Sequence, residues 1–374
     1  MNFDLSEEQQ LIQDSVSRFI NDNYSLEQRE VLVKSKAGFS SEHWQQMAEL
    51  GWLGLPFSED QGGFGGNQVD TMIVMEQFGK GLVCEPYLSA IVLGGGALKY
   101  ATNQQLAAEW LPSVIEGSKR LALAYAEVQS RFDLNDVATH ARPEGDDYVV
   151  NGQKSMIQNG EGADAYVVSV RLSGSHADST GIGLLLIPAD ADGLKANHFP
   201  TVDGLRATEL EFKDVRVPMS QLLVSGDRGF QMLTKIAADG ILALSAEAVG
   251  AMEMLYKDTV AYTQEREQFG HPLADFQALQ HRMVDMFMEY EQCKSLLYRA
   301  TLEIAEDNED AARTVHALKY LIGKTAIFIG ESAVQLHGGM GVTEELRVGH
   351  YFKRLLVLDA QFGNSDHHLQ QFAA

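Results

Sequence analysis

A change in hydrophobic periodicity along the chain is the strongest constraint on its fold. Residues 1–115 carry apolar side chains at helical spacing, as between Leu11 and Ile20. From residue 121 the pattern changes to short β-branched or aliphatic runs, such as AYVVSVRL and TELEFKDVRVP, which are separated by turn residues. Helical spacing returns from Gly229 over longer stretches. We therefore predict a multi-domain α and β protein with an N-terminal helical domain (1–120), a central β domain (121–225) and a C-terminal helical bundle (226–374).

Caps and apolar spacing place individual helices. Ser6 and Gln9 have the spacing of a capping box, which predicts a helix over residues 6–21. Further N-terminal helices are expected at residues 42–50, 69–78, 88–100 and 104–115. In the C-terminal part we expect long helices at residues 229–265, 309–336 and 344–360, and one more helix marked by an apolar seam. The seam positions are Met283, Met286, Tyr290, Cys293, Leu297, Ala300 and Ile304.

Composition excludes several classes of partner. The formal net charge is −23, from 52 acidic and 29 basic residues, which argues against nucleic acid or an anionic membrane surface. No apolar run reaches the length of a transmembrane helix, and MNFDLSEEQQ does not resemble a signal peptide. The two cysteines provide neither a disulfide framework nor metal-ligand spacing. We expect a cytoplasmic protein without a metal site.

Two stretches have residues suited to binding a ligand. TQEREQFGHPLADFQALQHRM, residues 263–283, joins two long helices through a break at Gly270 and Pro272. Arg266 beside this break offers a fixed fork of donors to a phosphate group, although a polar helix corner with a solvated arginine is an equally good interpretation. QLHGGMGVTEE, residues 335–345, has three glycines after a long helix, which suits either a close backbone approach to a ligand or a simple helix cap.

Other familiar motifs are incomplete. The Gly-rich loop SEDQGGFGGNQ does not fit the dinucleotide fingerprint, because Gln68 stands where its last glycine would fall. GKTA at Gly323 has Leu318 in place of the first glycine of a phosphate-binding loop. There is no G-x-S-x-G hydrolase motif. These observations exclude the common nucleotide-binding and hydrolase signatures.

Six segments in a fixed order resemble the acyl-CoA dehydrogenase family over nearly the whole chain. They are FDLSEEQQ, LGWLGLPFSEDQGGFGG, NGQKSMIQNG, FKDVRVP, TQEREQFGHPLADFQALQHRM and QLHGGMGV. The resemblance implies an N-terminal helical domain, a central β-barrel domain and a C-terminal four-helix bundle. It also implies FAD as cofactor, an acyl-CoA substrate oxidised to the 2,3-enoyl-CoA, and electron transfer to an electron-transfer flavoprotein. In the family a carboxylate removes the α-proton while the β-hydrogen leaves as hydride.

The resemblance assigns cofactor positions residue by residue. Arg266, Gln268 and Phe269 match contacts to FAD across a dimer interface, and Gln277 lies in the matching segment after the break. Gln335 and Gly339 match contacts to the adenosine-diphosphate part of FAD in a neighbouring subunit. These matches imply that the cofactor site is shared between subunits.

The chemistry positions depart from the family pattern. Met156 and Gln158 stand where the family has W-I-S or W-I-T against the flavin ring, and Gly363 and Gly240 occupy the two usual positions of the catalytic base. The candidate substitutes are Asp239, one residue before Gly240, and Asp366, three residues after Gly363. Glu247 is a further candidate, two helical turns beyond Asp239. Each of these carboxylates also fits an ordinary exposed or capping role.

Two further segments, FGNSDHHL and GKGLVCEPYL, are similar to small or partner subunits of heteromeric acyl-CoA dehydrogenases of pimeloyl-CoA or steroid side-chain degradation. Two functions remain open at this point. The chain is either an FAD-dependent acyl-CoA dehydrogenase, working as a homo-dimer, homo-tetramer or hetero-oligomer in fatty acid or steroid catabolism, or a catalytically silent partner that donates part of an FAD site. Flavin content and turnover of the purified chain would separate them.

Overall fold

The computed structural model describes residues 5–374, apart from the side chain of Asp227. Contacts group these residues into two compact units, which are described separately below. Unit 1 contains residues 5–31, Gln68–Val83 and Ile241–Ala374, and unit 2 contains Leu32–Asn67 and Cys84–Gly240. Among residues 5–374, no helix is long and apolar enough to cross a membrane.

The N-terminal part is helical, as expected. The capping box of Ser6 and Gln9 is present and starts α1 (Glu7–Asn23), whose Val16, Phe19 and Ile20 are buried. The remaining elements of this part are α2 (Leu26–Lys34), α3 (Ser41–Glu49), η1 (Trp52–Gly54), η2 (Glu59–Gln61), α4 (Gln68–Gly81), η3 (Leu88–Gly95), α5 (Gly96–Lys99) and α6 (Gln104–Ile115). The expected helix over residues 88–100 is divided, because η3 is π-helical and only its last turn, α5, is an α-helix.

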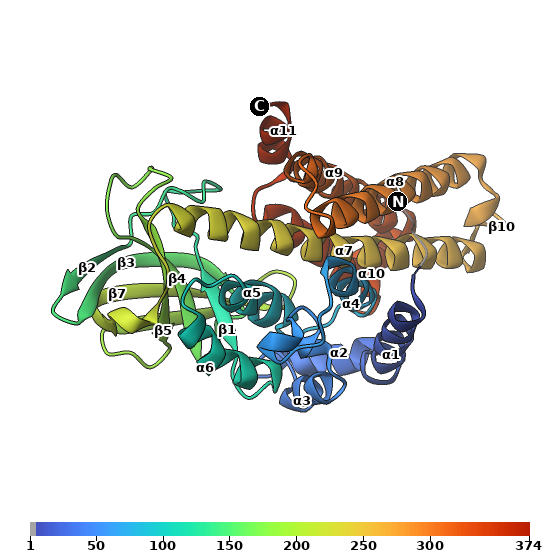
Figure 1. The fold of residues 1–374 in the computed structure, drawn as a ribbon. Coiled ribbons are helices and arrows are strands. Elements are labelled where there is room, and N and C mark those ends of the chain that lie inside the picture. Colours follow the sequence, from blue (N-terminus) through green and yellow to red (C-terminus); the bar gives the residue numbers. More distant parts are fainter. Residues whose placement is uncertain (1–4) are drawn as a thin grey trace. The chain divides into compact units, whose positions relative to one another are not determined.

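The central part is an eight-stranded sheet in unit 2 (Figure 1). Its strands follow the order β6-β7-β3-β2-β4-β5-β8, and β1 pairs with β4 in parallel. Apolar residues of alternating strand positions fill its core, including Val150, Val168 and Phe212. The strand bounds are β1 (Leu121–Ala124), β2 (His140–Glu144), β3 (Asp147–Gln158), β4 (Ala165–Arg171), β5 (Ile182–Pro188), β6 (Leu194–Pro200), β7 (Arg206–Pro218) and β8 (Leu222–Val224).

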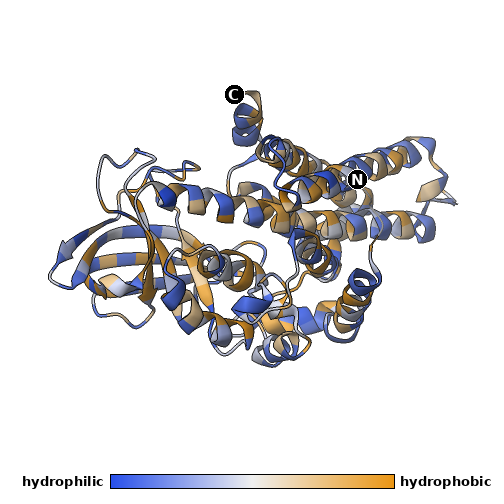
Figure 2. Ribbon diagram, viewed as in Figure 1, coloured by the Kyte–Doolittle hydropathy of each residue, from blue (hydrophilic) through white to orange (hydrophobic). Residues whose placement is uncertain are grey.

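Long helices form the C-terminal part: α7 (Asp227–Glu265), α8 (Gln277–Ala305), α9 (Ala311–His337), α10 (Arg347–Ala360) and the shorter α11 (Ser365–Ala373). Short elements connect them: β9 (Glu267–Gln268), β10 (His271–Pro272), η5 (Leu273–Asp275) and η6 (Gly338–Val342). Figure 2 shows apolar and polar residues alternating along these helices, as expected for a bundle that buries one stripe of each helix. The predicted seam of α8 is buried from Met283 to Ala300, and Ile304 is half-buried. The predicted order of helices, sheet and helical bundle is confirmed.

Small residues allow α4 and α7 to approach closely within unit 1. A Cβ atom added to Gly79 would lie 1.9 Å from the Glu247 carbonyl oxygen, and one added to Gly250 would lie 1.9 Å from the Glu76 carbonyl oxygen. Each helix therefore has a glycine where the backbone of the other passes. The Gly residues of α7 do not interrupt it, so this segment is one continuous helix, as predicted.

Candidate cofactor and active-site elements

A short hairpin between α7 and α8 carries three of the predicted cofactor residues. β9 and β10 pair across Phe269 and Gly270, which both have positive φ, +59° and +81°. The Phe269 side chain is 88% exposed and makes an edge-on contact with Phe276 at 6.1 Å between ring centroids. Arg266 and Gln268 on this hairpin, and Gln277 at the start of α8, are also exposed. A large apolar side chain held out in this way is suited to contact another molecule.

The second predicted segment lies at the end of α9. Gln335 is exposed, and a Cβ atom added to Gly339 would meet nothing within 4 Å, so its backbone is open to close approach. His337, between these two residues, stacks on Tyr262 at 4.2 Å between ring centroids. Tyr262 is one helical turn before Arg266, whose amide donates to the Tyr262 carbonyl oxygen at 2.8 Å. The structure therefore brings the Arg266 and Gln335–Gly339 segments to the same end of the bundle.

The predicted flavin-ring segment forms an irregularity in β3 of unit 2. The register between β3 and β7 shifts between Lys154 and Ile157. Met156 within this bulge has φ +52° and a 56% exposed side chain, whereas Ile157 is buried and Gln158 is half-buried. Bulges of this kind redirect a side chain, and here the exposed thioether can pack against a flat ligand.

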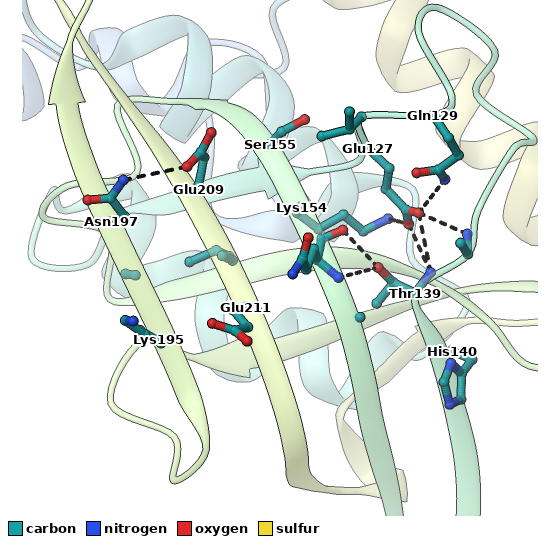
Figure 3. A pocket seen from close by; sticks show the side chains of 16 residues that line it. Glu127, Gln129, Thr139, His140, Lys154, Ser155, Lys195, Asn197, Glu209 and Glu211 are labelled. Atoms are coloured by element: carbon teal, nitrogen blue, oxygen red, sulfur yellow. Dashed lines mark hydrogen bonds and ion pairs between the residues drawn. The ribbon is translucent and has the colours of Figure 1, made fainter.

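A pocket of about 670 Å³ lies beside this bulge, between β2, β3, β6 and β7 (Figure 3). The buried Lys154 ammonium donates to Glu127 at 2.6 Å, to the Ser169 hydroxyl at 2.8 Å and to the Tyr125 carbonyl oxygen at 3.3 Å. Burial lowers the pKa of Lys154 to about 8, although Glu127 works in the opposite direction. The sequence reasoning did not select this pair. The sequence signal for this pair was a lysine within the predicted strand segment NGQKSMIQNG. Lysine is seldom fully buried without a partner, so a lysine on a buried strand implies a nearby acidic residue.

The first usual base position, Gly363, has no room for a side chain. Its φ is +108°, and an added Cβ atom would lie 2.6 Å from His367 Cδ2 and 2.9 Å from His368 Nε2. His368 is buried and fixed at both ring nitrogens, by His316 Nδ1 at 2.9 Å and the Phe362 carbonyl oxygen at 3.0 Å. The packing of His368 therefore fills the space that a carboxylate-bearing side chain would need.

The candidate substitute bases lie in different surroundings. Asp239 Oδ2 accepts a hydrogen bond from the Tyr100 hydroxyl at 2.6 Å, and the Lys235 ammonium lies 4.5 Å from the centroid of the Tyr100 ring. Asp366 is exposed in the first turn of α11. Glu247 is buried and forms a bidentate ion pair with Arg354, whose Nε and Nη2 atoms donate to the two carboxylate oxygens at 2.6 and 2.8 Å. Asp239 is thus the half-buried candidate, held by a phenol, and Asp366 has the place of an ordinary helix-terminal acid.

Comparison with known proteins identifies the family. The N-terminal, middle and C-terminal domains of acyl-CoA dehydrogenase match residues 6–118, 122–215 and 227–374. A short-chain specific acyl-CoA dehydrogenase of Clostridium acetobutylicum is 29% identical, with 98% of this chain and 97% of the relative covered. These matches follow the whole order of helices, sheet and bundle, and the chain belongs to the acyl-CoA dehydrogenase family.

Two solved structures extend this similarity. PigA with FAD and proline is 26% identical with a TM-score of 0.92, covering 100% of this chain and 98% of PigA. The Tcur3481–Tcur3483 steroid ACAD is 26% identical with a TM-score of 0.88, covering 98% of this chain and 97% of the matched chain. The recognition of the family from its six segments is confirmed.

Proposed function

We propose that this chain takes part in the α,β-dehydrogenation of an acyl-CoA thioester, with FAD as cofactor, as a cytoplasmic subunit of an oligomer. Membership of the acyl-CoA dehydrogenase family and the similarity to PigA with FAD support this activity. When bound, FAD would accept the hydride from the β-carbon.

The residues present fit one side of such a cofactor. Arg266 offers a charged donor fork for phosphate oxygens, and the open backbone at Gly339 permits close approach of the diphosphate. Phe269 offers an exposed aromatic surface, and Gln268, Gln277 and Gln335 are exposed amides of the same end of the bundle. In unit 2, taken by itself, the exposed Met156 and the neighbouring Gln158 would suit a flavin ring. Because this surface is exposed in a single chain, we propose that another subunit covers it.

We further propose that another chain supplies the catalytic base. The observation that carries this is Gly363, where the positive φ and the fixed His368 ring exclude the usual carboxylate. Asp239, the half-buried alternative, already has its Oδ2 atom engaged by a short hydrogen bond from the Tyr100 hydroxyl. In this form the chain is a partner subunit that contributes to the FAD site, and an electron-transfer flavoprotein would receive the electrons from the assembled enzyme.

The Tcur3481–Tcur3483 steroid ACAD, which this chain resembles, is named for two different chains. This similarity and the FGNSDHHL segment favour a hetero-oligomer over a homo-oligomer. The test is co-expression with a dehydrogenase-like chain that has a carboxylate at one of the two usual base positions. We expect the two chains to co-purify, and acyl-CoA-dependent dye reduction to disappear when the carboxylate of the second chain is replaced by its amide.

Asp239→Asn in this chain tests the competing candidate, with Asp366→Asn as a matched control for loss of one acidic group. We expect both variants to keep most of the activity of the complex. A chain that turns over acyl-CoA by itself, and loses this activity only with Asp239→Asn, would identify Asp239 as the base and contradict the partner role.

A further inference from the structure

A second cavity lies in unit 1, and none of the residues that line it is a predicted cofactor residue. It has a volume of about 510 Å³ and is formed by α1, the turn after α1, the end of α4, α7 and the start of α10. These helices are labelled in Figure 1. Volumes of this order are typical of small-molecule sites. The proposed dehydrogenase function makes no use of this cavity.

Cations dominate the wall of this cavity. Among the described residues that line it, Lys80, Lys257 and Arg347 are basic and Glu253 is the one acid. Such an excess is unexpected in a chain with 52 acidic and 29 basic residues. A wall of this kind attracts an anion, because like-signed charges in a concave surface reinforce one another.

Ion pairs hold these cations in place without neutralising all of them. Glu253 lies 3.0 Å from the Lys80 ammonium and 2.5 Å from that of Lys257. Asp258 receives two hydrogen bonds from Arg347, at 2.5 and 2.6 Å. Burial opposes ionisation of Glu253, but the hydrogen bond from Lys257 and the charge of Lys80 lower its pKa to about 2. Glu76 is a third carboxylate of this network, 3.6 Å from the Lys80 ammonium and 4.0 Å from that of Lys294. Four cations therefore meet three carboxylates, which leaves an excess of one positive charge.

A buried amide in the same wall has an unused donor. Gln77 is 4% exposed, and its Oε1 accepts a hydrogen bond from the Ser17 hydroxyl at 2.9 Å. Its Nε2 has no hydrogen-bond partner among residues 5–374. Buried amide donors ordinarily have a hydrogen-bond acceptor, so we expect the Gln77 Nε2 group to bind an acceptor from a ligand. An oxyanion beside Lys80 would provide it.

The remaining wall is apolar. Ile20, Leu82 and Met254 line the cavity together with the rings of Tyr24 and Tyr351. The Tyr351 hydroxyl donates to the Lys80 carbonyl oxygen, so its polar end is already satisfied. The Lys257 side chain is 53% exposed, which leaves the charged side of the cavity accessible from solvent. The lining thus combines one surplus positive charge with a hydrocarbon surface.

We propose that this cavity binds an organic monocarboxylate with an apolar body, its carboxylate placed between Lys80, Lys257 and the Gln77 amide. A single negative charge matches the single surplus positive charge of the wall, and Ile20, Leu82 and Met254 cover the hydrocarbon part. The site uses none of the predicted cofactor residues and does not depend on the proposed role of the chain in catalysis.

Calorimetric titration of the full-length chain with octanoate tests this site, with octanamide and octyl phosphate as neutral and phosphate analogues. We expect octanoate to bind with a Kd below about 1 mM and at least about tenfold more tightly than either analogue. Lys257→Gln and Gln77→Met should each weaken octanoate binding by about tenfold. Lys353→Gln is the matched control, since Lys353 also pairs with a glutamate, at 2.6 Å, but does not line the cavity.

The outcomes separate this site from others. Circular dichroism of each variant checks that it is folded before the titration is interpreted. Octanoate binding that is unchanged in folded Lys257→Gln and Gln77→Met belongs to a different site and overturns the proposal. Equal affinity for octanamide, or tighter binding of octyl phosphate, overturns the carboxylate assignment.

Discussion

Substitution of Gly363 tests whether the fold itself excludes a base at this position. Gly363→Ala would place a Cβ atom 2.6 Å from His367 Cδ2 and 2.9 Å from His368 Nε2, in a backbone with φ +108°. The unfavourable backbone costs about 1–3 kcal/mol, and overpacking against a fixed ring costs about 1–3 kcal/mol more. We therefore expect the free energy of unfolding to fall by about 2–6 kcal/mol.

Gly145→Ala provides the matched control for this experiment. Gly145 has φ +66°, but a Cβ atom added there would meet nothing within 4 Å, so only the conformational cost of about 1–2 kcal/mol applies. Chemical denaturation followed by circular dichroism measures both variants. If Gly363→Ala is no more destabilising than Gly145→Ala, the packing argument is refuted. Acyl-CoA turnover by Gly363→Glu without any second chain would also refute it, because a carboxylate would then fit.

Three further predictions concern the bundle and the cofactor segments. Glu247→Gln should reduce the free energy of unfolding by about 3–5 kcal/mol, since it removes the carboxylate that accepts two hydrogen bonds from the buried Arg354 guanidinium. Glu344→Gln in an exposed pair should cost at most about 1 kcal/mol, and equal losses in denaturation would contradict this expectation. Burial lowers the pKa of His368 to about 3, from 6.5. Because the unfolded chain therefore takes up a proton at a higher pH than the folded chain, the free energy of unfolding should decrease as pH falls from 6.5 toward 3, by up to about 1.4 kcal/mol per pH unit. Melting curves of folded His368→Gln should show a smaller loss over that range, and an unchanged slope would reject the assignment. In the assembled enzyme, Arg266→Ala should weaken FAD binding by about 10- to 100-fold, through loss of a charged hydrogen bond, while Arg282→Ala, another exposed arginine of this region, should leave FAD binding unchanged in a fluorescence titration.

Regular periodicity made most of the fold predictable. The α8 seam and the Ser6 capping box are local patterns, and both are found where the sequence placed them. α2 was not predicted, because its one buried residue is Arg29, whose guanidinium reaches the Leu82 carbonyl oxygen at 2.9 Å instead of forming an apolar stripe. α11 was missed because it is short and follows the left-handed Phe362 and Gly363. Neither the buried arginine of α2 nor the left-handed turn before α11 produces a recognisable spacing of hydrophobic residues.

The site was less accessible to sequence reasoning, because its decisive features are contacts between distant residues. The sequence places glycine at position 363, but the reason that no carboxylate fits is the contact of His368 with His316, 52 residues away. The Tyr100 hydrogen bond to Asp239 joins residues 139 positions apart. The proximity of the Arg266 and Gln335 segments, through Tyr262 and His337, is likewise a property of packing. The roles assigned to these cofactor residues stay predictions.

The flavin content of the chain purified alone tests the central claim most directly. We predict that this chain, supplied with excess FAD and then separated from free cofactor, retains little flavin and catalyses no acyl-CoA-dependent dye reduction. Co-purification with its partner chain should restore both. One tightly bound FAD per chain, with sustained turnover in the absence of any second polypeptide, would contradict the account.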